Sequence, residues 1–165
     1  MPHKTRREVI RIAGKLKEVV TVLDEKGTIL HKMINPLMVE FYARDLMQIM
    51  IGASILAVPV AYTEEAWNLG ESLPFVNILT IMALSLVFIS IFVYYNFYRA
   101  RLNEHRFEFV KRVASIYLVS FAIVGILLTL IERAPWNTDV MLAFKRIVLV
   151  SFPASMSAAI SDMIK

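Results

Sequence analysis

Four apolar segments, each long enough to cross a bilayer, constrain this chain more than any other feature of its sequence. They cover approximately residues 46–63, 73–95, 113–131 and 140–164. A transmembrane helix needs about 20 apolar residues to cross about 30 Å of hydrocarbon. Because backbone polar groups inside lipid must be hydrogen-bonded within the chain, we predict that all four segments are helices. The sequence therefore predicts an all-α membrane domain over residues 45–165.

The distribution of Lys and Arg predicts how these helices are oriented. Nine basic residues precede the first segment, whereas the loop near Trp67 has none and the loop near Pro135 has only Arg133. Five more lie between the second and third segments: Arg99, Arg101, Arg106, Lys111 and Arg112. Because loops rich in Lys and Arg stay in the cytoplasm, we expect a multi-pass protein of the cell membrane with both termini cytoplasmic. Topology thus explains the net charge of +4, and we predict no nucleic-acid partner.

Residues 1–44 form a predicted cytoplasmic arm. Apolar residues recur in it at spacings of three and four: Val9, Ile12, Leu16, Val19 and Leu23. This spacing favours an amphipathic helix, either in a short coiled coil or lying on anionic lipid headgroups. A β-hairpin is the alternative, because Glu18–Leu23 and Thr28–Lys32 flank the turn-forming segment Asp24–Gly27.

The first apolar segment ends with two adjacent carboxylates, Glu64 and Glu65. Ala53, Ala57 and Ala61 recur every four residues before them. Small residues at this spacing let helix backbones approach closely in lipid. We therefore expect Glu65 to continue the alanine face and Glu64 to flank it, so that both pack against protein.

Two prolines interrupt the predicted helices. Pro59 lies in the first segment and Pro153 in the fourth, and because each removes a backbone hydrogen bond we predict a kink at both. Both segments are rich in small residues, so we expect them to be the inner helices. The second segment is bulkier and contains the polar Asn77.

Charged residues at the outer end of the bundle predict an ion-pair cluster. Charges inside the membrane are costly and are usually paired. Lys145 and Arg146 lie about two turns into the fourth segment. Because the first and fourth helices run in opposite directions, these cations can reach the depth of Glu64 and Glu65.

A second charged cluster is predicted at the inner end. Arg44 and Asp45 begin the first segment and Asp162 ends the fourth, so that Arg44 can pair with Asp162. The pairs at the two ends have two interpretations. They hold the helices in register, or Glu64 or Glu65 binds a cation or a proton.

Composition argues against several kinds of chemistry. The chain has no Cys, so disulfides and thiolate metal sites are excluded. His3, His31 and His105 are scattered without metal-ligand spacing. The serines of the fourth segment lack a nearby base, and no H-E-x-x-H or G-x-S-x-G pattern occurs. We therefore predict no enzymatic activity, no cofactor and no metal site.

The segment Pro59–Trp67, PVAYTEEAW, resembles a family of prokaryotic predicted integral membrane proteins of unknown function. In that family a proline in a small-residue helix precedes an acidic residue and a Trp. The segment Phe152–Asp162 is similar to the closing segment of the family. The resemblance covers most of the membrane region. It implies the four spans and draws attention to Glu64, Glu65, Pro153 and Asp162, but it implies no activity.

Two functions are consistent with this sequence. A small homo-oligomer would place Glu64 or Glu65 in an acidic ring, which is one way to select a monovalent or divalent cation. It would then be a cation channel or an ion-coupled transporter, with Asp162 and Asn77 as further ion-binding candidates. The alternative is a membrane-anchored interaction or sensory protein whose arm self-associates or binds a partner.

Overall fold

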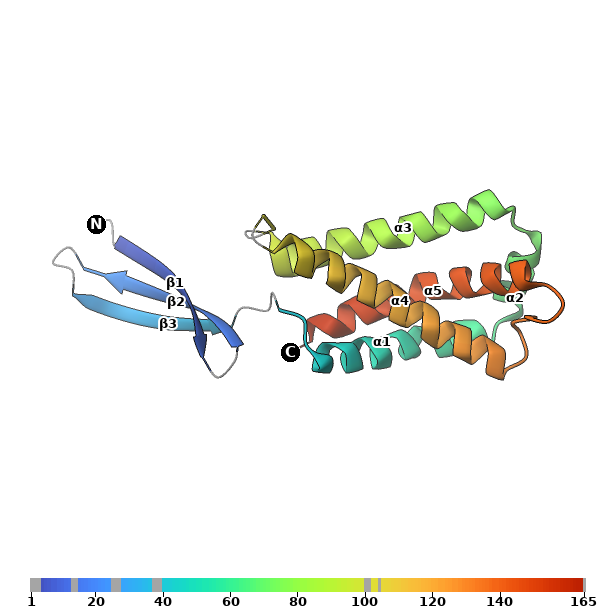
Figure 1. The fold of residues 1–165 in the computed structure, drawn as a ribbon, viewed down its shortest axis with the longest axis horizontal. Helices are drawn as coiled ribbons and strands as arrows, with labels where there is room; N and C mark the ends of the chain where they lie inside the picture. Colours follow the sequence, from blue (N-terminus) through green and yellow to red (C-terminus); the bar gives the residue numbers. More distant parts are fainter. Residues whose placement is uncertain are drawn as a thin grey trace. The chain divides into compact units, whose positions relative to one another are not determined.

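The computed structural model describes residues 4–12, 15–24, 28–36, 40–99, 102–103 and 105–164. The chain divides into two compact units, Met1–Glu40 and Phe41–Lys165. The first unit contains strands and the second contains helices (Figure 1).

The N-terminal unit is a three-stranded antiparallel sheet in the order β1-β2-β3. The strands are β1 (Lys4–Ile12), β2 (Lys15–Leu23) and β3 (Ile29–Pro36). Val19 on the central strand pairs with Glu8 of β1 and Ile34 of β3, and its exposed fraction is 4%. The edge strand β3 keeps its large apolar side chains exposed: Ile29, Leu30, Met33 and Ile34.

The favoured helical interpretation of the arm is therefore wrong, and the hairpin alternative is confirmed. β2 and β3 pair on either side of the predicted turn, where the Asp24 N–H donates to the Thr28 carbonyl at 2.9 Å. The physical reason lies in the run Val19–Val22, which consists of β-branched residues. Such side chains are restricted in a helix and pack well on a pleated sheet.

Four helices of the second unit are long and apolar enough to cross a membrane. They are α1 (Ala43–Ala61), α3 (Phe75–Val93) with its continuation in the π-helix η1 (Tyr94–Tyr98), α4 (Arg106–Leu130) and α5 (Val140–Met163). The four predicted segments are thus confirmed as helices. Pro59 and Pro153 lie inside α1 and α5, and both helices continue past them.

The helix α5 is the central element of the bundle, because it contacts α1, α2, α3 and α4 (Figure 1). It approaches α1 closely at Gly52. A Cβ atom added to Gly52 would lie 2.3 Å from the Cβ of Ser161 and 3.0 Å from the Cα of Ala158. The glycine is thus required by the distance between two backbones, which is how small residues act in membrane helix packing.

A short helix, α2 (Glu64–Ser72), separates the first two spans. The chain leaves α1 at Tyr62, and Thr63 has the extended backbone of a helix N-cap. Glu64 and Glu65 begin α2 and are exposed. The expectation that they extend the alanine face is therefore wrong. In the first turn of a new helix, their carboxylates instead face a favourable helix dipole.

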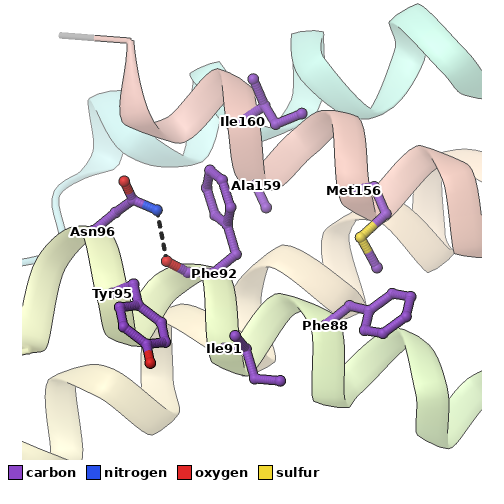
Figure 2. A pocket seen from close by; sticks show the side chains of 8 residues that line it. All are labelled: Phe88, Ile91, Phe92, Tyr95, Asn96, Met156, Ala159 and Ile160. Carbon is purple, nitrogen blue, oxygen red and sulfur yellow. Dashed lines mark hydrogen bonds between the residues drawn. The ribbon is translucent and has the colours of Figure 1, made fainter.

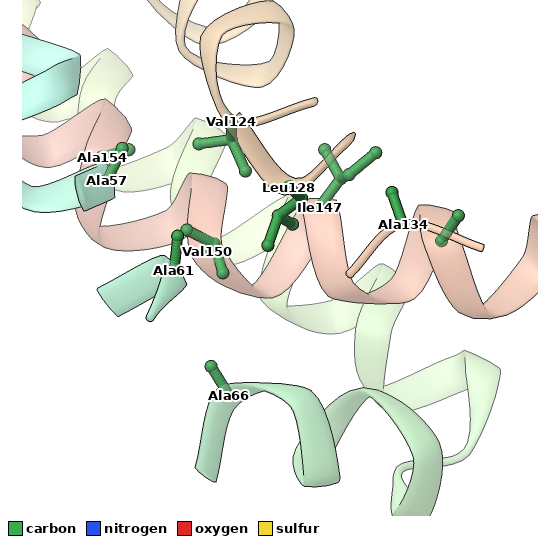
Figure 3. Packing of buried hydrophobic residues seen from close by; sticks show 10 residues of the cluster. Ala57, Ala61, Ala66, Val124, Leu128, Ala134, Ile147, Val150 and Ala154 are labelled. Atoms are coloured by element: carbon green, nitrogen blue, oxygen red, sulfur yellow. The ribbon is translucent and has the colours of Figure 1, made fainter. Parts of the chain in front are cut away.

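The apolar core of the bundle lies around the α5 half that begins at Val140 (Figure 3). Its buried members come from α1, α2, α4, α5 and the loop after α4: Ala57, Ala61, Ala66, Val124, Leu128, Ala134, Ala143, Ile147, Val150 and Ala154. Alanine is frequent in this set, so the helices here are held together by close backbone approach more than by large side chains.

Candidate charge site at the start of α1

Arg112 is a fully buried arginine on α4. It follows the first residue of α4 by six positions, or about 9 Å along the helix axis. A buried stripe with a spacing of four residues continues from it: Ile116, Ser120, Val124 and Leu128. The guanidinium therefore points into the bundle, because it occupies the same face as these core residues.

Two carboxylates from other helices flank this guanidinium. The Nη1 of Arg112 lies 3.0 Å from the Oδ2 of Asp162 on α5, and its Nη2 lies 3.6 Å from the Oδ2 of Asp45 on α1. All three side chains are at most 1% exposed. We call Asp45, Arg112 and Asp162 the charge site. It joins three of the four long helices at one end of the bundle.

The two carboxylates occupy opposite kinds of helix terminus. Asp45 lies in the first turn of α1, where the helix dipole favours a negative charge, and its Oδ2 accepts the Tyr42 N–H at 3.0 Å. Asp162 lies in the last turn of α5, where the dipole disfavours a negative charge. Asp162 therefore depends more than Asp45 on the Arg112 guanidinium.

Aromatic rings cover the guanidinium of Arg112. Its central carbon lies 4.0 Å from the ring centroid of Phe97 and 5.7 Å from that of Phe41. Such cation–π contacts strengthen when water is excluded. Tyr98 is fully buried beside them, with its ring 5.5 Å from that of Phe109. The charge site is consequently a buried site with aromatic walls.

A second buried cation lies at the other end of α5. Arg146 is 8% exposed, and its guanidinium donates to Glu71 Oε1 at 2.6 Å, to the Arg133 carbonyl at 2.9 Å and to the Trp67 carbonyl at 3.3 Å. The Arg133 guanidinium lies 3.8 Å from the Trp67 ring centroid. A Cβ atom on Gly70 would lie 2.5 Å from Arg146 Cγ, so α2 passes directly over this side chain.

A family model described as "Putative integral membrane protein (DUF2391)" matches residues 20–164. The chain belongs to the DUF2391 family. The match includes both ends of the bundle, and the four apolar helices of this DUF2391 protein agree with it. No curated protein and no solved structure matches the chain.

The predicted pairing of Arg44 with Asp162 is wrong for this DUF2391 protein. Arg44 is exposed, and Arg112 takes its place beside both Asp45 and Asp162. Arg112 was counted among the loop cations because the third segment was predicted to begin at residue 113, whereas α4 begins seven residues earlier, at Arg106. The four-residue stripe that starts at Arg112 is the signal that identifies it as an interior residue.

The predicted outer pairs are also wrong. Among the described residues, Glu64, Glu65 and Lys145 form no ion pair, and both glutamates are exposed. Arg146 pairs with Glu71 instead. Because α1 ends before Glu64 and Glu65, these side chains do not continue its packed face. Glu71 in the last turn of α2 forms the ion pair with Arg146.

The remaining ion-binding candidate is Asn77. Asn77 is exposed in the first turn of α3. Within the described residues, no group of three His, Asp or Glu side chains could hold a metal ion.

Replacing Arg146 with glutamine is expected to lower the free energy of unfolding by about 1–2 kcal/mol, because hydrogen bonds to two carbonyls and one carboxylate are lost. Because Glu71 is 58% exposed, water weakens its ion pair with Arg146, and the expected loss of stability is modest. Lys145→Gln is the matched control on the same helix and should leave the free energy of unfolding unchanged. Denaturation in detergent, followed by Trp fluorescence, measures both. Equal stability of the two variants would contradict the prediction.

Proposed function

We propose that this chain is an ion-coupled protein of the cell membrane, a transporter or channel for a proton or another cation. The observation that supports the proposal is the composition of the charge site. It combines two carboxylates with one guanidinium, all at most 1% exposed. With both carboxylates ionised, the three side chains carry one net negative charge. An ionised carboxylate in the buried part of a membrane protein is costly, so a proton or cation that binds at one of these two acids would lower that cost.

Asp162 is the proposed ion-binding residue. The helix dipole favours a carboxylate at Asp45 but opposes one at Asp162. Binding a proton or cation at Asp162 weakens its attraction to Arg112 and leaves Asp45 as the counter-ion. Because Arg112 belongs to α4 and Asp162 to α5, this exchange changes the force between two helices, which is how binding would be coupled to movement.

Orientation and assembly form part of the proposal. The basic segments around Arg99 and Arg106 lie at the charge-site end, so the positive-inside rule assigns that end and both termini to the cytoplasm. Glu64 and Glu65 then lie at the outer end as an acidic entrance for cations. Four spans are few for a transporter built from internal repeats, so we propose a homo-oligomer.

Flux through reconstituted protein tests the proposal. In liposomes with a pH-sensitive or cation-sensitive dye inside, we expect Asp162→Asn to lower the initial rate of flux by at least about tenfold, equivalent to 1.4 kcal/mol. Glu64→Gln and Glu65→Gln are the matched comparison, because these carboxylates are exposed at the opposite end. Their variants should retain most of the flux.

Two outcomes would overturn this assignment. If wild-type protein carries neither protons nor any common monovalent or divalent cation, the ion-coupled function is wrong. If Glu64→Gln or Glu65→Gln abolishes flux and Asp162→Asn does not, ion binding belongs to the outer carboxylates.

A second candidate function is interaction through the N-terminal sheet. The observation in its favour is the edge strand β3, on which Ile29 and Leu30 are 61% and 54% exposed. Exposed apolar edge strands readily pair with another chain. If this sheet is the functional part, deleting residues 1–35 should abolish self-association or partner binding while ion flux persists. If the deletion abolishes neither self-association nor partner binding, this second candidate function is wrong.

A further inference from the structure

An apolar groove of about 550 Å³ runs along the outside of the bundle between α3 and α5 (Figure 2). Phe88, Ile91 and Phe92 line it from α3, and Met156, Ala159 and Ile160 line it from α5. Ile91 and Ile160 are each about half exposed, so the groove opens away from the bundle. Both helices are long and apolar enough to cross a membrane, so the groove would open at the depth of the hydrocarbon.

The groove ends in polar residues at the charge-site end of α3. There the helix widens into the π-helix η1, whose Tyr95 and Asn96 complete the lining. Figure 2 shows Asn96 turned back toward Phe92, where its Nδ2 donates to the Phe92 carbonyl at 2.8 Å. Single π-turns in α-helices are frequent at functional sites. Here the π-turn places an amide at the end of an otherwise apolar surface.

Arg99 adds a positive charge at this end. Its guanidinium carbon lies 5.7 Å from the ring centroid of Tyr95, and Arg99 is exposed. The cation–π contact holds the cation beside a groove residue. A guanidinium is well suited to hydrogen-bond a phosphate. Charge complementarity thus indicates an anionic group at this end.

The length of the groove matches one leaflet of a bilayer. Phe88 and Asn96 are eight residues apart, which corresponds to about 12 Å along a helix. Half of the hydrocarbon thickness is about 15 Å. An acyl chain that fills the groove would therefore begin at the level of Arg99 and end near the middle of the membrane.

We propose that this groove binds one acyl chain of an anionic phospholipid, with the lipid phosphate against Arg99 and Asn96. The site is separate from the charge site and does not depend on ion transport. Its apolar wall accepts any acyl chain, and Arg99 supplies the preference for an anionic headgroup. A helix from a second copy of the chain could also cover the apolar wall, but it would leave Arg99 without a role, so we favour the lipid.

Native mass spectrometry of the full chain, purified in detergent, tests this site. Phosphatidylglycerol and phosphatidylcholine with identical chains are the probes. We expect the wild type to retain phosphatidylglycerol at about tenfold lower lipid concentration than phosphatidylcholine. Arg99→Gln should reduce this preference to about twofold or less, whereas Ile91→Trp, which fills the groove, should weaken retention of both lipids.

Arg106→Gln is the matched control, because Arg106 is exposed near the same end and bonds to Asn103 outside the groove. It should keep the lipid preference of the wild type. Equal retention of both lipids by the wild type would overturn the proposal. So would an equal loss of the preference for phosphatidylglycerol in the Arg99 and Arg106 variants. A dimer whose interface covers Ile91 would also overturn it. Arg99→Gln alters only an exposed side chain, so it decides the question even if Ile91→Trp fails to fold.

Discussion

Replacing Arg112 with glutamine is expected to lower the free energy of unfolding of the bundle by about 3–5 kcal/mol, the usual cost of removing one partner from a buried ion pair. The variant leaves Asp45 and Asp162 buried without the guanidinium that lies between them. It also removes the cation from the face of Phe97. Denaturant titration in detergent micelles, followed by far-ultraviolet circular dichroism, measures the loss.

Lys111→Gln is the control for this prediction. Lys111 precedes Arg112 on α4, but it is 44% exposed, and its contacts are a 3.7 Å ion pair with Glu108 and a position 5.8 Å from the ring centroid of Phe41. Its loss should change the free energy of unfolding by less than about 0.5 kcal/mol. Neutralising the acids as well, in Asp45→Asn and Asp162→Asn combined with Arg112→Met, should restore part of the stability. If the Arg112 and Lys111 variants are equally stable, the charge site does not hold the helices together.

Gly52→Ala is expected to lower the free energy of unfolding by about 2 kcal/mol, although alanine favours helices more than glycine does. The added Cβ would lie 2.3 Å from the Cβ of Ser161, so α1 and α5 must move apart. Because α5 contacts every other helix of the bundle, this displacement disturbs the core widely. The same titration measures the effect.

Gly125→Ala provides a matched comparison with the identical chemical change. Its Cβ would meet only the Cδ1 of Ile147, at an ordinary contact distance of 3.8 Å. This variant should be as stable as the wild type or slightly more stable. Combining Gly52→Ala with Ser161→Gly removes the opposing Cβ and should recover much of the loss. If Gly52→Ala has wild-type stability, α1 and α5 are not in close backbone contact at Gly52.

The sequence predicted the spans well because long apolar runs leave few alternatives in a bilayer. The predicted segment 140–164 and the observed α5, Val140–Met163, differ by only one residue. The short helix α2 was missed because it is amphipathic and follows α1 after only Tyr62 and Thr63. The hydropathy pattern marked the end of the first span near residue 63, but it did not show that a helix starts again at Glu64.

The candidate sites were predicted less completely. Asp45 and Asp162 were correctly placed together at one end, because the antiparallel helices bring those ends together. Their cation was assigned to Arg44, since sequence proximity suggested it, whereas the true partner comes from α4. Similarly, spacings of three and four in the arm suggested a helix. The β-branched run at Val19–Val22 was the stronger physical signal, because it acts on the backbone locally.

The arrangement of the charge site also has a consequence for the order of synthesis. A ribosome makes Asp45 on α1 first, then Arg112 on α4 and finally Asp162 on α5. When α4 enters the membrane, Asp45 is the one acidic member of the site already present to receive Arg112. The contact between α1 and α4 would therefore form before α5 exists. Arg112 would therefore enter the bilayer with the longer, 3.6 Å ion pair to Asp45. Its ion pair with Asp162 would form once α5 has been inserted.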